Sequence, residues 1–308
     1  MGEETGTARA ALAALGGATL LGLSPILVRV SELGPQASNL WRFVLALPIL
    51  ALWAVGTGRP IPQASQLRWL GVAGLLFGFE LSLWAAALSF TTVVNATLMS
   101  NMTPVFAALF GWWVFKERLR AGVYLGGAAA LTGALTLALA RASAEAGPAA
   151  DQGWIGDALG FGSAVGYAGY LLIVRHLGGR ASTGAVMFWA TSAAAVYALA
   201  LSLSVGEQLL PRTLNGWLVL LALGVIVQAA AQGLIAYGVA RLPIAVSTIM
   251  LWMQPLTAAV IAWILFGEAF GPLAFAGAAL ILAGVLIVQR SRAAPSRATD
   301  AASAASGS

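Results

Sequence analysis

The chain contains no cysteine and a single histidine, His176. Without thiols it has no disulfide, thiolate metal site or cysteine nucleophile, and one histidine cannot form a histidine cluster for zinc. It also lacks a Walker phosphate-binding loop, a His-Glu-x-x-His pair and a Gly-x-Ser-x-Gly elbow. We therefore expect no enzyme activity, no bound metal and no cofactor.

Charged residues are scarce as well, at 9% of the 308 residues, whereas 60% are hydrophobic. A soluble domain carries about 25% charged residues. A chain this poor in charge cannot cover a water-facing surface, so we expect its solvent to be lipid. The net charge of +5 would suggest nucleic acid for a soluble protein. Here we assign it to the loops and expect no nucleic-acid partner.

Ten apolar stretches approach the ~20 residues that cross a bilayer. They are predicted over residues 10–29, 38–56, 69–88, 93–115, 121–140, 155–174, 184–204, 215–236, 244–266 and 272–289. With a cytoplasmic N-terminus, 12 of the 16 Arg and Lys residues fall on the inner side, as the positive-inside rule requires. The fold class is therefore an all-α membrane protein with ten transmembrane helices and both termini cytoplasmic, in the bacterial inner membrane.

A gapless internal repeat runs through the chain. Fourteen of the 41 residues from Thr97 to Leu137 recur 151 positions later, from Thr248 to Val288. We divide the chain into a first five-span repeat (1–140), an outer linker (141–153), a second repeat (154–290) and a disordered cytoplasmic tail (291–308).

Five spans per repeat is an odd number, so the second copy enters the membrane from the opposite face. The loop Lys116–Arg120 keeps its acid but loses its bases in the counterpart Gly267–Gly271, as expected for loops on opposite sides. Inverted repeats give two related packings, each open to one side, around a midplane site. The pattern favours a secondary transporter working by alternating access.

Two matching segments carry a resemblance to a known family. Ala108 to Glu117 and Ala259 to Glu268 both read A-x-x-x-W-x-x-F-x-E, and a span with a Gly-x6-Gly pair follows each. With Trp41-Arg42-Phe43 opening the second span, the chain resembles the EamA branch of the drug/metabolite transporter superfamily. The resemblance implies spans 1–4 and 6–9 around a central cavity, with spans 5 and 10 as outer supports. It leaves the substrate open, because the family carries amino acids, vitamins, nucleotide derivatives and toxic organic compounds.

Glu80 is the acid nearest the middle of a span, where an ionisable side chain costs at least ~2.5 kcal/mol and usually faces a cavity or a partner. It is predicted to serve as a proton site or as a counter-ion for a cationic group. A structural hydrogen bond or ion pair is the alternative, with Arg42 as the natural partner. Arg29, at the outer end of span 1, is expected to snorkel to the interface or to capture an anionic substrate group. Asp157 is expected to cap span 6.

Further cavity or substrate-binding residues are predicted from polar and aromatic side chains within the spans. They are Trp41, Trp84, Thr97, Asn101, Tyr167, Tyr170, Trp189, Gln228, Gln232, Thr248 and Trp252. Helix capping, helix-to-helix hydrogen bonds and aromatic anchoring at the interface are the alternative roles. Hinge or gating roles are predicted for the repeated pairs Pro104/Pro255 and Glu117/Glu268, because a proline removes a helical hydrogen bond. An inherited kink without contact to substrate is the alternative.

We expect a secondary active transporter that exports small amphipathic metabolites such as amino acids, with proton coupling left open. Its partners would be the lipid bilayer, the small-molecule substrate and protons, in a monomer or homodimer. The alternatives are an uptake permease for a vitamin or nucleoside-like compound and, from another class, a passive channel or facilitator.

Overall fold

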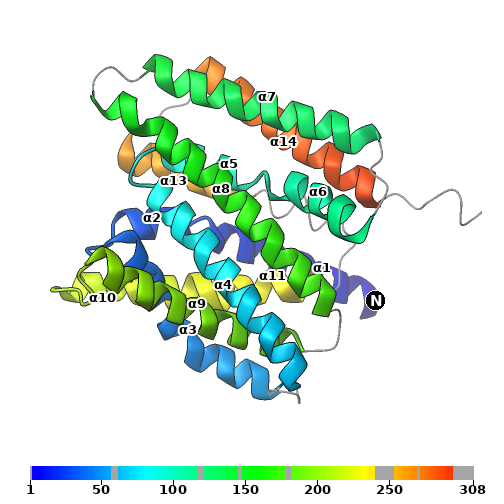
Figure 1. The fold of residues 1–308 in the computed structure, drawn as a ribbon, viewed down its shortest axis with the longest axis vertical. Helices are drawn as coiled ribbons and strands as arrows, with labels where there is room; N and C mark the ends of the chain where they lie inside the picture. Colours follow the sequence, from blue (N-terminus) through cyan, green and yellow to red (C-terminus); the bar gives the residue numbers. More distant parts are fainter. Residues whose placement is uncertain are drawn as a thin grey trace, which may run out of the picture.

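The computed structural model describes residues 2–56, 62–116, 121–144, 148–177, 182–239, 253–268 and 271–293. Over these ranges the chain is helical and contains no strand. The helices run back and forth across one bundle (Figure 1). The all-α prediction is therefore confirmed for the part of the chain that the structure describes.

The first half of the chain contains seven helical segments. They are α1 (Gly2–Leu21), α2 (Ser24–Arg29), α3 (Pro35–Gly56), α4 (Ala64–Ala87), α5 (Val93–Ser100), α6 (Thr103–Phe115) and α7 (Ala121–Ala144). The described part of the second half continues the series. It contains α8 (Pro148–Leu177), α9 (Thr183–Val205), α10 (Leu214–Leu221), the π-helix η1 (Ala222–Ala231), α11 (Gln232–Val239), α13 (Met253–Phe266) and α14 (Pro272–Ala293).

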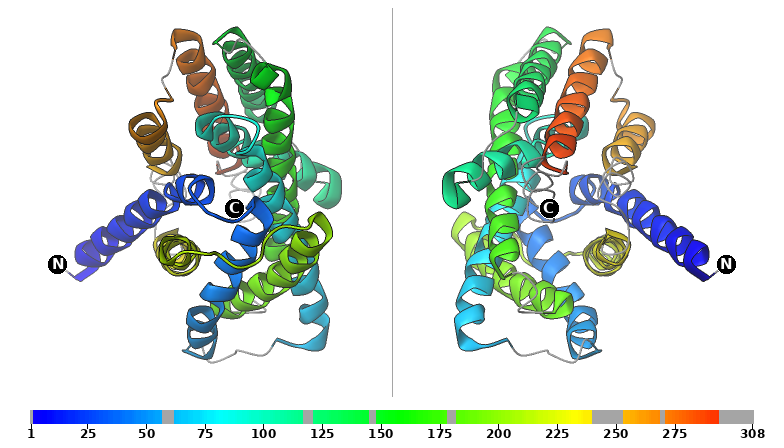
Figure 2. Two further views of the ribbon diagram at one scale, coloured as in Figure 1. Left: turned by 90° about the vertical axis from the view of Figure 1, so that its left-hand side faces the viewer. Right: turned by 90° about the vertical axis from the view of Figure 1, so that its right-hand side faces the viewer.

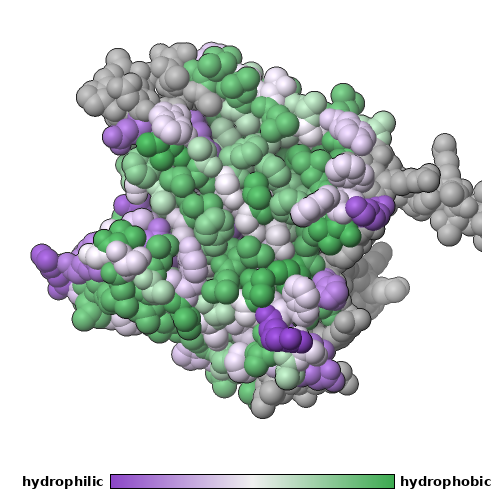
Figure 3. All heavy atoms as spheres, in the orientation of Figure 1, coloured by the Kyte–Doolittle hydropathy of each residue, from purple (hydrophilic) through white to green (hydrophobic). Residues whose placement is uncertain are grey.

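Seven of the described helical stretches are long and apolar enough to cross a membrane, and three shorter apolar helices accompany them. They fall at the positions of the ten predicted spans, although a full count of ten crossings stays a prediction. Hydrophobic residues dominate the middle of the face over α4, α7 and α8 (Figure 3). Side chains such as Leu52 (75% exposed) and Trp113 (67%) lie on the surface, where lipid rather than water suits them. The start of α1 and the end of α14 lie on the same side of the molecule (Figure 1).

Two spans break where proline or glycine interrupts the helix. In the fourth, α5 ends at Ser100 and α6 begins at Thr103, with Pro104 in its first turn. Proline suits the first turn because its missing N–H needs no partner there, and the hydroxyl of Thr103 donates to the freed Ser100 carbonyl at 2.8 Å. In the first span, Gly22 and Leu23 separate α1 from α2. The helix is interrupted just before Pro104, whereas the hinge or gating role predicted for this proline stays a prediction.

The same turn ends both copies of the repeated segment. Lys116 ends α6 with a φ of 54°, and its counterpart Gly267 follows α13 with a φ of 68°. This left-handed conformation suits glycine and strains a lysine. The turn at Gly267 positions Glu268, the next residue. Pro255, the repeat counterpart of Pro104, is buried in the first turn of α13.

Helices of the two halves pack in pairs. Helix α4 packs on α8 and α9, α3 packs on α9 and η1, and α1 packs on η1 and α11. In the repeat, α4 corresponds to η1 and α11, α8 corresponds to α1, and α9 corresponds to α3. The contact of α4 with α8 therefore has its counterpart in that of α11 with α1, and the contact of α4 with α9 has its counterpart in that of η1 with α3. The packing therefore has the exchange symmetry expected of a duplicated unit, and the surface between the halves runs through the middle of the bundle.

Helices α7 and α14 form one edge of the bundle (Figures 1 and 2) and pack against each other. Their contact is built on the repeated glycine pairs. A Cβ added to Gly126 would lie 2.5 Å from the carbonyl oxygen of Gly284, and one added to Gly133 would lie 2.6 Å from that of Gly277. Only glycine allows two helix backbones this close.

Candidate functional site

A buried arginine joins the two halves. Arg42, in the second turn of α3, is 2% exposed. Its Nε donates to Oε1 of Gln228 at 2.8 Å, and one terminal nitrogen donates to the hydroxyl of Ser24 at 2.9 Å. Arg42 and Ser24 belong to the first half and Gln228 to the second. The guanidinium is thus held in one orientation by side chains from three helical segments.

Gln228 is fully buried in η1. Its carbonyl oxygen faces Arg42, which places the amide nitrogen on the other branch of the side chain. That nitrogen has no hydrogen-bond partner among the described residues. Wide π-helical turns are rare and often lie at functional sites, and this one contains a glutamine whose donor is unused.

Glu80 lies in α4 and is 7% exposed. Its Oε2 accepts a long hydrogen bond of 3.4 Å from the hydroxyl of Ser163 in α8, and its Cβ faces Gly166. The charges of Glu80 and Arg42 attract each other, yet the two side chains form no ion pair within 4.0 Å. The direct ion pair weighed as the alternative role of Glu80 is therefore not formed, and Arg42 donates to Gln228 and Ser24 instead.

Aromatic side chains pack beside these charges. The rings of Tyr167 and Tyr170 are stacked, with centroids 5.5 Å apart and an angle of 14°. Phe77 follows Tyr170 at 5.1 Å, and Phe43 follows Phe77 at 5.7 Å. Tyr167 directly follows Gly166, which faces Glu80, and Tyr170 lies about one turn further along α8. Both tyrosines were predicted site residues. Neither phenylalanine was, although Phe43 belongs to the Trp41-Arg42-Phe43 motif, since a phenylalanine in an apolar span carries no distinguishing signal.

The predicted tryptophans have different surroundings. Trp41 packs edge-on against Trp217 at 4.9 Å and donates to the carbonyl of Leu209 at 2.6 Å. Trp84 belongs to the same buried core as Phe43, Phe77 and Tyr170. Trp189 lies near the start of α9, against the cluster of Leu70, Leu177 and Val186.

The polar residues of the fourth span serve the break in the helix. Thr97 donates to the carbonyl of Val93 at 2.7 Å, and the amide of Asn101 donates to the carbonyl of Thr97 at 2.7 Å. Gln232 begins α11 and is half-buried. Three predicted residues, Thr248, Trp252 and Glu117, lie outside the described residues.

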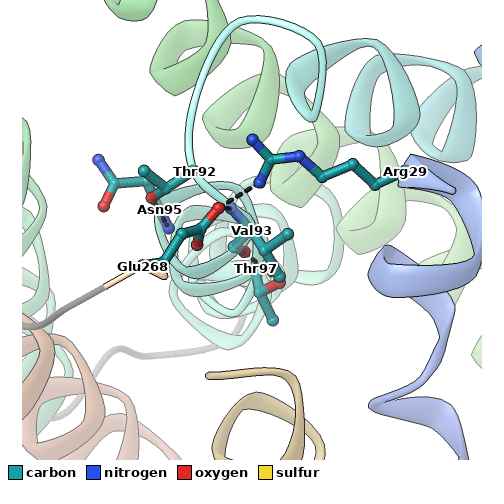
Figure 4. A network of polar contacts seen from close by, with 6 residues as sticks. All are labelled: Arg29, Thr92, Val93, Asn95, Thr97 and Glu268. Atoms are coloured by element: carbon teal, nitrogen blue, oxygen red, sulfur yellow. Dashed lines mark hydrogen bonds and ion pairs between the residues drawn. The ribbon is translucent and has the colours of Figure 1, made fainter. Parts of the chain in front are cut away.

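An ion pair joins the two halves at one side of the bundle. We call this side, where α2 ends and α3, α5 and α10 begin, the α10 side. The guanidinium of Arg29 pairs with the carboxylate of Glu268, which also accepts from the backbone N–H of Val93 at 3.1 Å (Figure 4). Arg29 also lies 4.7 Å from the centroid of Phe266. A carboxylate is stabilised at the N-terminus of a helix such as α5, so Glu268 joins α13 to two segments of the first half.

Two further acids on the α10 side link the halves, and sequence analysis missed both. Glu207 accepts from the backbone N–H groups of Gln36 (3.3 Å) and Ala37 (2.7 Å) at the start of α3. Glu32 accepts from the hydroxyl of Thr213 and from the backbone N–H of Arg212 (2.9 Å) before α10. These hydrogen bonds from Thr213 and Arg212 lower the pKa of Glu32. The sequence signal was an acid in a loop, which fits an ordinary solvated residue equally well.

Asp157 does not cap a helix, because α8 begins nine residues earlier, at Pro148. It is buried and accepts from the hydroxyl of Thr91 (3.0 Å) and the amide of Asn95 (3.2 Å). The N-cap of α5 is Thr92. Asp157 therefore adds a fourth contact between the halves near the same side.

The chain is similar in sequence to several known proteins and in fold to a solved structure. An uncharacterized transporter of Archaeoglobus fulgidus is 34% identical over 105 residues, which cover 32% of this chain and 36% of that protein. A probable terminal-alkyne amino-acid exporter of Streptantibioticus cattleyicolor is 28% identical over 277 residues, 86% of this chain and 87% of the exporter. One solved crystal structure superposes with a TM-score of 0.61 over 91% of this chain and 96% of the other, at 20% identity, which shows a shared fold.

The model of the EamA-like transporter family matches the chain twice, over residues 8–139 and 154–290. The two matches cover nearly all of the described helices and contain Arg42, Glu80, Gln228 and Glu268. Together with the apolar helices and the packing of the two halves, they show that this multi-pass membrane protein belongs to the EamA-like transporter family.

Proposed function

We propose that the protein is a secondary active transporter of the bacterial inner membrane that exports small amphipathic metabolites such as amino acids. The observation that carries the proposal is a set of buried polar groups between the halves, with Arg42 hydrogen-bonded to Gln228 and Glu80 within electrostatic range. Buried ionisable groups in a membrane protein are costly and mark substrate or ion pathways. Here they lie where two related halves meet, as in carriers built from inverted repeats.

Alternating access requires one side to close while the other opens. On the α10 side, Glu268, Glu207 and Glu32 each join one half to the other. We propose that this side is extracytoplasmic and that these contacts separate when the carrier opens outward. The break before Pro104 and the buried Pro255 would let the fourth and ninth spans bend. Glu117, the repeat counterpart of Glu268, would act on the cytoplasmic side.

Export of amino acids is supported by the relative from Streptantibioticus cattleyicolor, a probable terminal-alkyne amino-acid exporter that aligns over 86% of this chain. The site also argues against strongly anionic substrates, since Arg42 is the one arginine or lysine buried among the described residues. An uptake permease would use the same site with the opposite gradient.

Counterflow in proteoliposomes tests the proposal. The full-length protein is reconstituted, and uptake of a radiolabelled amino acid is followed with and without the same unlabelled amino acid inside. A carrier reorients faster when loaded, so internal substrate should raise the initial rate of labelled uptake. A passive channel would show no such stimulation, and that result would contradict the proposal for every amino acid that permeates.

Glu80 is the candidate for coupling to protons. An imposed pH gradient should drive net flux through the wild type and not through Glu80→Gln, which cannot ionise. The elution profile and melting temperature of Glu80→Gln in the same detergent serve as the controls for folding. If the gradient drives flux equally in both proteins, the coupling ion is not carried by Glu80.

A further inference from the structure

Resting on the proposed transport function, we propose that the site binds the headgroup of an α-amino acid or a similar zwitterion. Arg42 and Gln228 would hold the carboxylate, and Glu80 would hold the ammonium group.

The side formed by Arg42 and Gln228 has donors without acceptors. An arginine has five N–H groups, and Arg42 uses Nε on Gln228 and one terminal nitrogen on Ser24. The amide nitrogen of Gln228 is fully buried and has no partner among the described residues. Buried donors without acceptors are costly, and a carboxylate is the small group that satisfies several of them at once. The planar guanidinium fork matches a carboxylate in geometry.

The Glu80 side has the opposite character. Its carboxylate accepts a single long hydrogen bond, from Ser163 at 3.4 Å, and a carboxylate has about four acceptor positions. Seven residues of helix separate Glu80 from the end of α4, and seven separate Arg42 from the start of α3. Both ends lie on the α10 side, so each charge lies about 10 Å along its helix from that side. The two charges thus lie at similar depth.

The separation of these charges suits a ligand that carries both signs. They attract each other but lie beyond ion-pair distance. A zwitterionic headgroup placed between them gives each buried charge a partner and adds no net charge to the site, which limits the cost of burial. A cationic amine would leave Arg42 without an anion, and a simple carboxylic acid would leave Glu80 without a cation. The stacked rings of Tyr167 and Tyr170 lie beside Glu80 to receive an apolar side chain.

Three probes with one ring and different headgroups test the assignment. They are L-phenylalanine, 2-phenylethylamine, which lacks the carboxylate, and 3-phenylpropanoate, which lacks the amine. Binding to the full-length protein in lipid nanodiscs is measured by titration calorimetry, after the twenty standard L-amino acids have been compared for binding. L-Phenylalanine should bind at least about tenfold more tightly than either analogue, because each lost charge-assisted contact weakens binding by that factor.

Gln228→Glu tests the carboxylate side with little change in shape. The new carboxylate still accepts from Arg42 but replaces the free donor with a second negative charge. L-Phenylalanine and 3-phenylpropanoate should each bind at least about tenfold more weakly, and 2-phenylethylamine should bind at least as well as to the wild type. Gln152→Glu, the same substitution at an exposed position of α8, should leave all three affinities unchanged.

Glu80→Gln tests the ammonium side. It should remove the preference for L-phenylalanine over 3-phenylpropanoate while keeping the preference over 2-phenylethylamine. This crossed pattern of the two variants would not arise from a general loss of folding, which would weaken all three probes together.

The results separate the two proposals. If the wild type binds none of the twenty amino acids, or if both variants bind the three probes as the wild type does, the headgroup assignment is wrong. The transport proposal would survive if counterflow of any metabolite were still seen. If binding follows the assignment but no gradient or internal substrate drives flux, the headgroup site stands and the transport proposal fails.

Discussion

The acidic side chains on the α10 side differ in the donors from which they accept hydrogen bonds. Glu207 accepts only from backbone N–H groups at the start of α3. Glu268 shares its carboxylate between Arg29 and the start of α5. Glu32 accepts from both backbone and side-chain donors before α10. A carboxylate at a helix N-terminus is stabilised in its ionised form, so we expect the link made by Glu32, whose pKa is lowered, to depend on pH.

Glu32 makes this dependence measurable. Its hydrogen bonds from Thr213 and Arg212 lower its pKa in the folded protein. Because the pKa of Glu32 is lower in the folded protein than in the unfolded chain, its ionised carboxylate stabilises the fold at a pH above the ordinary pKa of a glutamate. This stabilisation is lost as the pH falls through the pKa that Glu32 has in the folded protein. The melting temperature of Glu32→Gln should therefore lie below that of the wild type at pH 7, and the difference should vanish in strong acid.

Thr213→Ser keeps a hydroxyl donor and is the matched control, so its pH profile should follow the wild type. A difference between wild type and Glu32→Gln that stays constant from pH 7 into strong acid would mean that the ionised carboxylate is not what stabilises this link.

At the residue scale the sequence located buried ionisable residues better than it located their contacts. Glu80 and Arg42 were found because ionisable residues inside apolar spans are rare. Their partners, Ser163, Ser24 and Gln228, come from distant segments, and no local pattern announces which helices will meet. For the same reason Arg29 was expected to snorkel or to bind substrate, whereas it pairs with Glu268, 239 residues away.

At the scale of elements, close packing of α7 and α14 depends on individual glycines. Gly126 and Gly127 are neighbours but face different surroundings. A Cβ on Gly126 would lie 2.5 Å from a backbone oxygen of α14, whereas one on Gly127 would meet the side chain of Val105 at 3.5 Å, an ordinary contact. Gly126→Ala should therefore destabilise the protein by about 1–3 kcal/mol through overpacking.

Gly127→Ala is the matched control and should be neutral or slightly stabilising, because alanine is the better helix former. Thermal unfolding of both variants in the same detergent measures the difference. Equal melting temperatures for the two variants would show that α7 and α14 do not approach as closely as described.

The elements were predictable because hydrophobic length is a strong signal in membrane proteins. The break at Pro104 was expected as well, since proline cannot donate a helical hydrogen bond. The π-helix of η1 and the break at Gly22 were not, since Ala, Gly and Leu also occur throughout intact helices of this chain.

At the scale of the whole molecule, the four contacts on the α10 side keep the halves together in this conformation. The absence of cysteine makes a test straightforward, because introduced thiols have no competitors. Arg29→Cys/Glu268→Cys, bridged by a short reversible thiosulfonate reagent, should lose counterflow and regain it on reduction. Each single variant, treated in the same way, is the control for loss of the ion pair alone.

Full flux through the bridged protein would mean that this side need not open during transport.

The family and the packing of two related halves could be anticipated from the repeat, because duplication leaves a sequence signature that a substrate does not. Substrate choice depends on a few side chains between the halves, and the sequence does not reveal how they are spaced.

The glycine contact between α7 and α14 also bears on how the duplicated halves can change over time. Gly126 meets the backbone at Gly284, and Gly284 meets the backbone at Gly126. Gly284 is the repeat counterpart of Gly133, and Gly277, the counterpart of Gly126, meets Gly133 in the same way. A mutation that enlarges one copy is opposed by the other copy, so neither can drift alone. Residues that face substrate can diverge between the halves after duplication. The paired glycines of α7 and α14 must instead stay small together.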